Sequence, residues 1–266
     1  MCIIAIAWQL FDDLPLVTLS NRDEFLDRPT TPAHQWADKP IFAGRDDKSG
    51  GTWLGIQQTT ESTDHVSQNG YGDNRWGAVL NFREGIPANP DQRSRGELVT
   101  NFLTSDLSPM DYAKQIKLED YAGFNLIVGN DRQAVVVNNR GYPPTALHSG
   151  LHVISNGQPT DDWFKTERLR RRMSQEVLPL IQSANGRREA WLASSWNVLS
   201  DTTPASLDYL PDTGVAQNLE YLLSSICIDT PDLPNYGTRT QSILTMERLG
   251  NEKGMSLDLF SRDYIR

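Results

Sequence analysis

The start of this chain could place a nucleophile and a base on one residue. Cys2 follows Met1 directly, and a residue as small as Cys is compatible with removal of the initiator methionine. The mature chain would then begin with Cys2, whose free α-amine has a reference pKa of about 7.7–8.0 and can accept a proton near neutral pH. Since a thiol attacks as thiolate, nearby cations would favour the reaction. Residues 1–2 therefore predict nucleophilic catalysis by Cys2.

Two predicted strands position this cysteine. Residues 2–8 form an apolar run with three isoleucines, typical of a buried strand, and residues 16–20 form a second strand that makes a hairpin with it. The polar run Asn21-Arg22-Asp23-Glu24 comes directly after the second strand. Ends of buried strands are common places for site residues. We therefore expect these four residues beside Cys2.

Three further polar features lie in or beside predicted strands. Asn81 interrupts the apolar run of residues 76–82, and Asn156 follows the strand predicted over residues 151–155. Arg239 precedes the strand predicted over residues 242–246. Amide and guanidinium groups at such positions could bind a substrate carbonyl or a thiolate.

Composition excludes several function classes. The net charge of −9 and pI near 4.9 argue against a nucleic-acid surface, which needs a basic face. No apolar run approaches the roughly 20 residues of a membrane-spanning helix, and no secretory signal is recognisable. With two cysteines and no disulfide framework, a cytoplasmic location is expected. Metal and nucleotide signatures are absent, so no cofactor is predicted.

The order of predicted elements favours a single α+β domain over residues 1–266. Strands come in antiparallel-looking pairs, whereas helices are predicted over residues 94–104, 110–117, 160–182 and 189–199. Three prolines predict irregular structure over residues 27–40. This pattern differs from the alternating strands and helices of a parallel sheet. No repeat or linker marks a domain boundary.

Taken together, these motifs resemble those of the NRDE family, also called the transport and Golgi organisation 2 family. The resemblance extends from residue 1 to about 246. It is carried by the Met1-Cys2 start, Ser20-Asn21-Arg22-Asp23-Glu24-Phe25, Arg28-Pro29, Gly50-Gly51-Thr52-Trp53-Leu54-Gly55, Asn81-Phe82-Arg83-Glu84, Gly123-Phe124-Asn125-Leu126, Ser155-Asn156 and Tyr236-Gly237-Thr238-Arg239.

The resemblance implies a four-layer αββα sandwich of the N-terminal-nucleophile hydrolase type. The choloylglycine hydrolase and penicillin V acylase group would be mechanistic relatives, and these cleave amide bonds with an N-terminal cysteine. The implied site consists of Cys2 as nucleophile with Arg22, Asp23, Asn81, Asn156 and Arg239. Asp23 would hold the α-amine, and Asn81 would form the oxyanion hole, where one donor is worth roughly 3–4 kcal/mol. Asn156 would bind the amine or the substrate carbonyl, and Arg239 would close the site.

One departure from that group affects the pair Arg22 and Asp23. The group separates its arginine and aspartate by two residues, whereas these two are adjacent. Because side chains alternate along a strand, Arg22 and Asp23 would face opposite sides of the sheet. Both can reach one site only if the strand has ended or bulged.

Several readings of these residues remain open. Cys2 could be an ordinary buried strand residue, and Arg22 and Asp23 a structural ion pair. At the level of function, the leading hypothesis is a hydrolase of carbon–nitrogen bonds acting on a small acyl amide. The alternative is a non-enzymatic haem or lipid binding or trafficking protein on the same fold, and a weaker one is a structural partner protein. No assembly state is predicted.

Overall fold

A computed structural model of the chain describes residues 2–58, 74–86, 89–183, 188–250 and 254–264. Its strands form two antiparallel sheets. The first sheet has the order β10 (Gly150–Ile154), β1 (Cys2–Trp8), β2 (Leu16–Phe25), β11 (Tyr236–Arg248), β12 (Met255–Asp263). The second has the order β3 (Thr30–Gln35), β4 (Ile41–Asp46), β5 (Leu54–Gln57), β6 (Trp76–Asn81), β7 (Phe124–Gly129), β8 (Ala134–Asn138), β9 (Thr145–Ala146).

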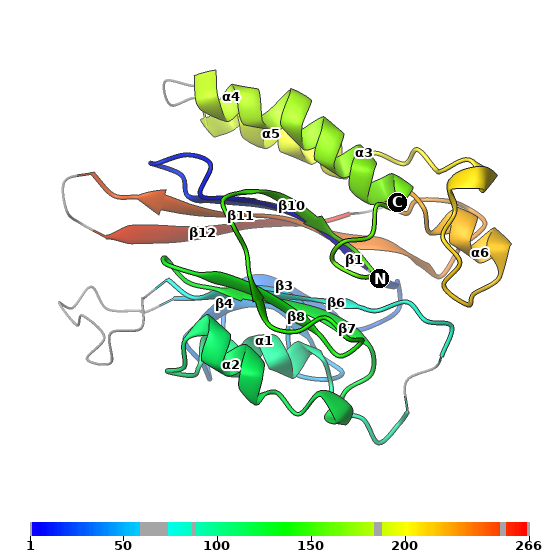
Figure 1. The fold of residues 1–266 in the computed structure, drawn as a ribbon, viewed down its shortest axis with the longest axis horizontal. Coiled ribbons are helices and arrows are strands. Elements are labelled where there is room, and N and C mark those ends of the chain that lie inside the picture. The colour runs from blue at the N-terminus through cyan, green and yellow to red at the C-terminus, as the bar shows by residue number, and fades with distance from the viewer. Residues whose placement is uncertain (1, 59–73, 87–88, 184–187, 251–253, 265–266) are drawn as a thin grey trace.

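Helices lie on the outer faces of the two stacked sheets (Figure 1). The second sheet is covered by α1 (Gly96–Leu103) and α2 (Pro109–Gln115). The first is covered by α3 (Phe164–Arg172), a π-helical turn (Met173–Val177), α4 (Leu178–Ser183) and α5 (Arg188–Leu199). A further helix, α6 (Gln217–Leu222), lies at one end. The expected α+β class with antiparallel sheets is confirmed, as are the four helical regions.

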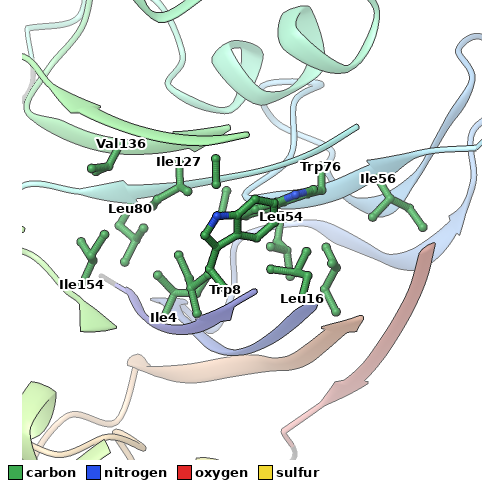
Figure 2. Packing of buried hydrophobic residues seen from close by; sticks show 14 of the residues in the cluster. Ile4, Trp8, Leu16, Leu54, Ile56, Trp76, Leu80, Ile127, Val136 and Ile154 are labelled. Carbon is green, nitrogen blue, oxygen red and sulfur yellow. The ribbon is translucent and has the colours of Figure 1, made fainter. Parts of the chain in front are cut away.

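Alternating side chains of β1 divide the core into separate layers. Ile4, Ile6 and Trp8 pack between the two sheets, where the rings of Trp8 and Trp76 lie 6.3 Å apart (Figure 2). Ile3 and Ala5 face the helices instead. We call these sides the inter-sheet face and the helix face. Cys2 belongs to the inter-sheet face at the end of its core.

The second strand is longer than predicted. Because β2 runs from Leu16 to Phe25, residues 21–24 lie inside a strand instead of following one. Asn21 and Arg22 pair with both β1 and β11, and the pairing with β11 continues through Asp23 and Glu24. Strand pairing thus overrides the polar composition that suggested a strand end.

The prediction of irregular structure over residues 27–40 is wrong, because β3 occupies Thr30–Gln35. Its pairing with β4 is irregular between Thr31 and His34, on either side of Pro32. An edge strand tolerates a proline at such a place, since the missing N–H need not bond a neighbour. Within the described ranges, the helices are too short or too polar to cross a bilayer.

Candidate functional site

A cavity of about 610 Å³ opens where the inter-sheet core ends at Cys2. Of the predicted site residues, four line it: Cys2, Arg22, Asp23 and Asn81. Most of the remaining wall comes from the end of β2 and the segment after it, from the loop between β4 and β5, and from the residues before α1. Its other lining residues are Glu24, Phe25, Arg28, Asp46, Lys48, Ser49, Thr52, Trp53, Val79, Asn89, Gln92, Arg93, Ser94, Arg95, Gly96, Ala122 and Tyr236.

Cys2 lines the cavity with 8% of its surface exposed. The register of the hairpin places it opposite Arg22 on the same face of the sheet. Burial raises the pKa of the Cys2 thiol, and the charge of Arg22 acts in the opposite direction. Since burial is the larger effect, the thiol needs a base to become a nucleophile at neutral pH.

Arg22 is held by ionic and aromatic contacts. Its Nη2 lies 3.2 Å from Oδ2 of Asp46 and 3.7 Å from a carboxylate oxygen of Glu24. Its guanidinium carbon lies 4.3 Å from the ring centre of Trp53. The same Asp46 accepts a 2.6 Å hydrogen bond from Arg28. Arg22 therefore pairs with Asp46, and the predicted Arg22–Asp23 ion pair is not among the ion pairs of the described residues.

Asp23 occupies the helix face of β2. Its Oδ1 accepts a 2.6 Å hydrogen bond from the hydroxyl of Thr238, which lies opposite it in β11. Its neighbour Asn21 donates 2.8 Å hydrogen bonds to the carbonyls of Leu199 and Ile226. Burial raises the pKa of the Asp23 carboxyl. The expected alternation therefore holds: β2 pairs in register through Asp23, and the irregularity lies in β11 between Thr238 and Thr240.

Asn81 and Asn156 are joined by a hydrogen bond. The side chain of Asn156 donates from Nδ2 to the carbonyl oxygen of Asn81 over 2.9 Å. The hydroxyl of Ser155 donates both to the Cys2 carbonyl and to Oδ1 of Asn156, each over 3.1 Å. Asn156 is fully buried and is not part of the cavity lining, whereas Asn81 lines the cavity. Among the described residues, no partner bonds the side-chain amide of Asn81.

Lys165 is a buried residue that the sequence interpretation missed. Its Nζ donates a 2.9 Å hydrogen bond to Oδ1 of Asn156, and only 2% of its surface is exposed. Burial, reinforced by the charge of Arg83, lowers the pKa of Lys165 to about 7. The signal was present, because Lys165 lies four residues before Leu169 and eight before Met173, on the apolar stripe of the helix.

Arg239 lies apart from the cavity lining. Its guanidinium donates to the carbonyl oxygens of Arg28 and, over 3.5 Å, of Phe25. These contacts fix the segment between β2 and β3, which carries Arg28 into the cavity wall. The structure thus brings Cys2, Arg22, Asp23 and Asn81 together in the cavity lining. Asn156 contacts this group through its hydrogen bond to Asn81, whereas Arg239 contacts the cavity wall only through Arg28.

Arg95 is a cavity residue that the sequence interpretation also did not predict, because residues 94–104 show only the pattern of a helix. It is the N-cap residue of α1, and its Nη1 donates a 3.0 Å hydrogen bond to the carbonyl of Gly123. Within the described ranges, no three histidine, cysteine or acidic residues cluster closely enough to hold a metal ion.

Comparison with known proteins gives a consistent result. The family model for Transport and Golgi organisation 2 matches residues 1–255. A Bos taurus relative, "Transport and Golgi organization protein 2 homolog", is 32% identical over 94% of this chain and 90% of its own length. A Mus musculus homologue is 30% identical over 100% of this chain and 96% of its own length. A Homo sapiens homologue is 30% identical over 99% of this chain and 95% of its own length. The chain belongs to the Transport and Golgi organisation 2 family.

Proposed function

We propose that this protein is a cysteine amidohydrolase of the N-terminal-nucleophile type that acts on a small acyl amide. The observation that carries the proposal is the position of Cys2 in a cavity of about 610 Å³ that Arg22 and Asn81 also line. The stacking of two sheets between two helical layers agrees with such a hydrolase (Figure 1). A volume of this size suits a small molecule.

In the proposed reaction, the α-amine of Cys2 takes the thiol proton after removal of Met1. The sulfur then attacks the carbonyl carbon of the amide, and the side-chain amide of Asn81 donates a hydrogen bond to the developing oxyanion. The proton passes to the leaving nitrogen as the carbon–nitrogen bond breaks, which leaves a thioester on Cys2. Attack by water releases the acid and regenerates the thiol. Met1 lies outside the described residues.

The surrounding residues would support this sequence of steps. The charge of Arg22 favours the thiolate over the thiol. Asp23 carries a carboxylate on the helix face of the neighbouring strand, where it would orient the α-amine. Lys165 and Asn156 would fix the backbone of Asn81, because Asn156 bonds its carbonyl oxygen. Arg239 would contribute indirectly, because its hydrogen bond to the Arg28 carbonyl would fix Arg28 in the cavity wall.

The test is amide hydrolysis by purified protein, measured as amine release from a panel of fluorogenic N-acyl aminocoumarins. Wild type is expected to release the amine, Cys2→Ala to release none, and Asn81→Ala to be about 10²–10³-fold slower, as for loss of one oxyanion donor. Cys227→Ala is the matched control, since Cys227 is buried outside the cavity lining.

The mass of the N-terminal peptide must be measured on the same sample. Removal of Met1 is expected, and retention of Met1 in protein that turns over amides would contradict the base assignment. If no member of the panel is hydrolysed while one is bound tightly, the proposal fails and the non-enzymatic binding alternative replaces it.

A further inference from the structure

The charged residues of the Cys2 cavity do not balance one another. Its wall carries five cationic side chains and three carboxylates, although the whole chain has a net charge of −9. The cationic ones are Arg22, Arg28, Lys48, Arg93 and Arg95, and the carboxylates are Asp23, Glu24 and Asp46. The side chains that line the cavity therefore carry more positive than negative charge, although the protein as a whole is acidic.

Most of these cations have carboxylate partners. Arg22 and Arg28 share Asp46 and Glu24, and Arg93 lies 2.5 Å from Glu97. Lys48 is exposed, so water solvates its charge. Arg95 differs from all of them: it forms no ion pair with any described residue, and its one hydrogen bond goes to the neutral carbonyl of Gly123.

Arg95 is also only partly exposed to solvent. Burial lowers the pKa of its guanidinium, whereas the negative form of Cys2 and the carboxylates of Glu24 and Glu84 raise it without forming an ion pair with it. A guanidinium that has lost part of its water and has no carboxylate at ion-pair distance among the described residues is stabilised by an anionic ligand, and its planar fork matches a carboxylate. The start of α1 adds to this, because Ser94 and Gly96 line the same cavity and a helix N-terminus favours negative charge.

Close backbone packing fixes Arg95 in this place. Gly51, in the loop between β4 and β5, lies so close to Gly96 that a Cβ on Gly51 would come within 2.5 Å of the Gly96 carbonyl carbon. The N–H of Thr52 also donates to the Gly96 carbonyl over 3.3 Å. The start of α1 is thereby anchored to the cavity wall, and Arg95 is presented from a rigid element.

We propose that the cavity recognises a carboxylate through Arg95, so that the substrate is a small N-acyl amide that itself carries a carboxylate group. The class of substrate rests on the proposed hydrolase function. Recognition of the carboxylate does not, because it requires only the cavity and the guanidinium. The two claims can therefore fail separately.

The experiment compares alkylation of Cys2 by iodoacetate and by iodoacetamide, which differ in the carboxylate. Rates at Cys2 are read from the N-terminal peptide by mass spectrometry, and the ratio of iodoacetate to iodoacetamide is compared with that for Cys2 in the urea-unfolded chain. The ratio in folded wild type is expected to exceed the unfolded reference by about tenfold or more, as for one hydrogen bond to a charged group. Arg95→Met should return it to the reference, and Arg95→Lys should keep part of it.

Arg171→Met is the matched control, because Arg171 is exposed on α3 and outside the cavity lining. It should leave the ratio unchanged. A wild-type ratio equal to the unfolded reference, or an elevated ratio that survives in Arg95→Met, would overturn the proposal. Neither result depends on turnover, so loss of the hydrolase function would leave this test valid.

A second measurement needs no reaction at Cys2. N-acetylglycine is expected to raise the Tm of wild type, whereas its neutral counterpart N-acetylglycinamide should raise it less, and Arg95→Met should remove the difference. Equal shifts for the two compounds in wild type would contradict recognition of the carboxylate.

Discussion

The two faces of β2 use one polar segment in opposite ways. On the helix face, the side chains of Asn21 and Asp23 are buried and bond Leu199, Ile226 and Thr238, although Asp23 also contributes to the cavity lining. On the inter-sheet face, Arg22 and Glu24 line a cavity and pair through Asp46 and Arg28. A strand that alternates in this way has one face held by buried hydrogen bonds and one face on the Cys2 cavity, so we expect the two faces to respond differently to substitution.

Asn21→Ala should give the largest loss of stability. The substitution removes two hydrogen bonds to buried carbonyls, which predicts a loss of about 2–4 kcal/mol in the free energy of unfolding. Urea denaturation measures it. Asn101→Ala is the control, since Asn101 is exposed on α1 and should change stability by less than about 0.5 kcal/mol. Equal effects at the two sites would show that the two hydrogen bonds of Asn21 do not stabilise the fold.

Arg22→Met should act on chemistry at the other face. Without this cation the pKa of the Cys2 thiol rises further, which predicts slower alkylation by iodoacetamide at a fixed pH below that pKa. The rate of Cys2 labelling against pH measures the change. An unchanged profile in Arg22→Met would show that Arg22 does not influence the thiol.

Lys165→Met should change how stability depends on pH. The pKa of Lys165 is about 7 in the fold, against an ordinary value of 10.5, so between these values the unfolded chain binds a proton that the folded chain lacks. The free energy of unfolding of wild type therefore gains a contribution that rises with pH across this window, at most about 1.4 kcal/mol per pH unit. Lys165→Met lacks this contribution. Urea unfolding of both proteins at pH 7, 8 and 9 measures it, and parallel curves would contradict the assignment.

Glu24→Gln should have the smallest effect. Its carboxylate lies 3.7 Å from Arg22 and 3.9 Å from Arg28, while Asp46 remains closer to both. We expect less than about 1 kcal/mol of lost stability, the range of partly exposed ion pairs. Denaturation beside Asn21→Ala checks this. A loss of stability as large as that of Asn21→Ala would show that the side chains of the inter-sheet face also stabilise the fold.

Local patterns predicted much of the fold. The apolar run of residues 2–8 and the helical stripes gave the hairpin and the helical regions, because burial imposes their periodicity. Family motifs placed Cys2, Arg22, Asp23 and Asn81 near one another, and all four line the cavity. The length of β2 was missed, because pairing with β11 on its far side is a long-range effect.

The roles of Lys165 and Arg95 could be recognised only from the structure. Lys165 is buried only because α3 packs against the end of β10 and places its amine on Asn156. Arg95 is a site candidate only because Gly51 and Gly96 bring two distant segments into contact. Neither contact can be predicted from the residue types near it in the sequence. The position of Lys165 on the apolar stripe of its helix indicates burial but not the bond to Asn156.

The central claim is that Cys2 is the nucleophile, and an acyl-enzyme trap tests it most directly. Wild type is mixed with a fluorogenic N-acyl aminocoumarin that it hydrolyses, quenched in acid, and the N-terminal peptide is weighed. The account predicts an acyl group on Cys2, in a peptide without Met1, that neutral hydroxylamine removes as expected for a thioester. Hydrolysis of that compound with no acyl group on Cys2, or equal hydrolysis by Cys2→Ala, would contradict it.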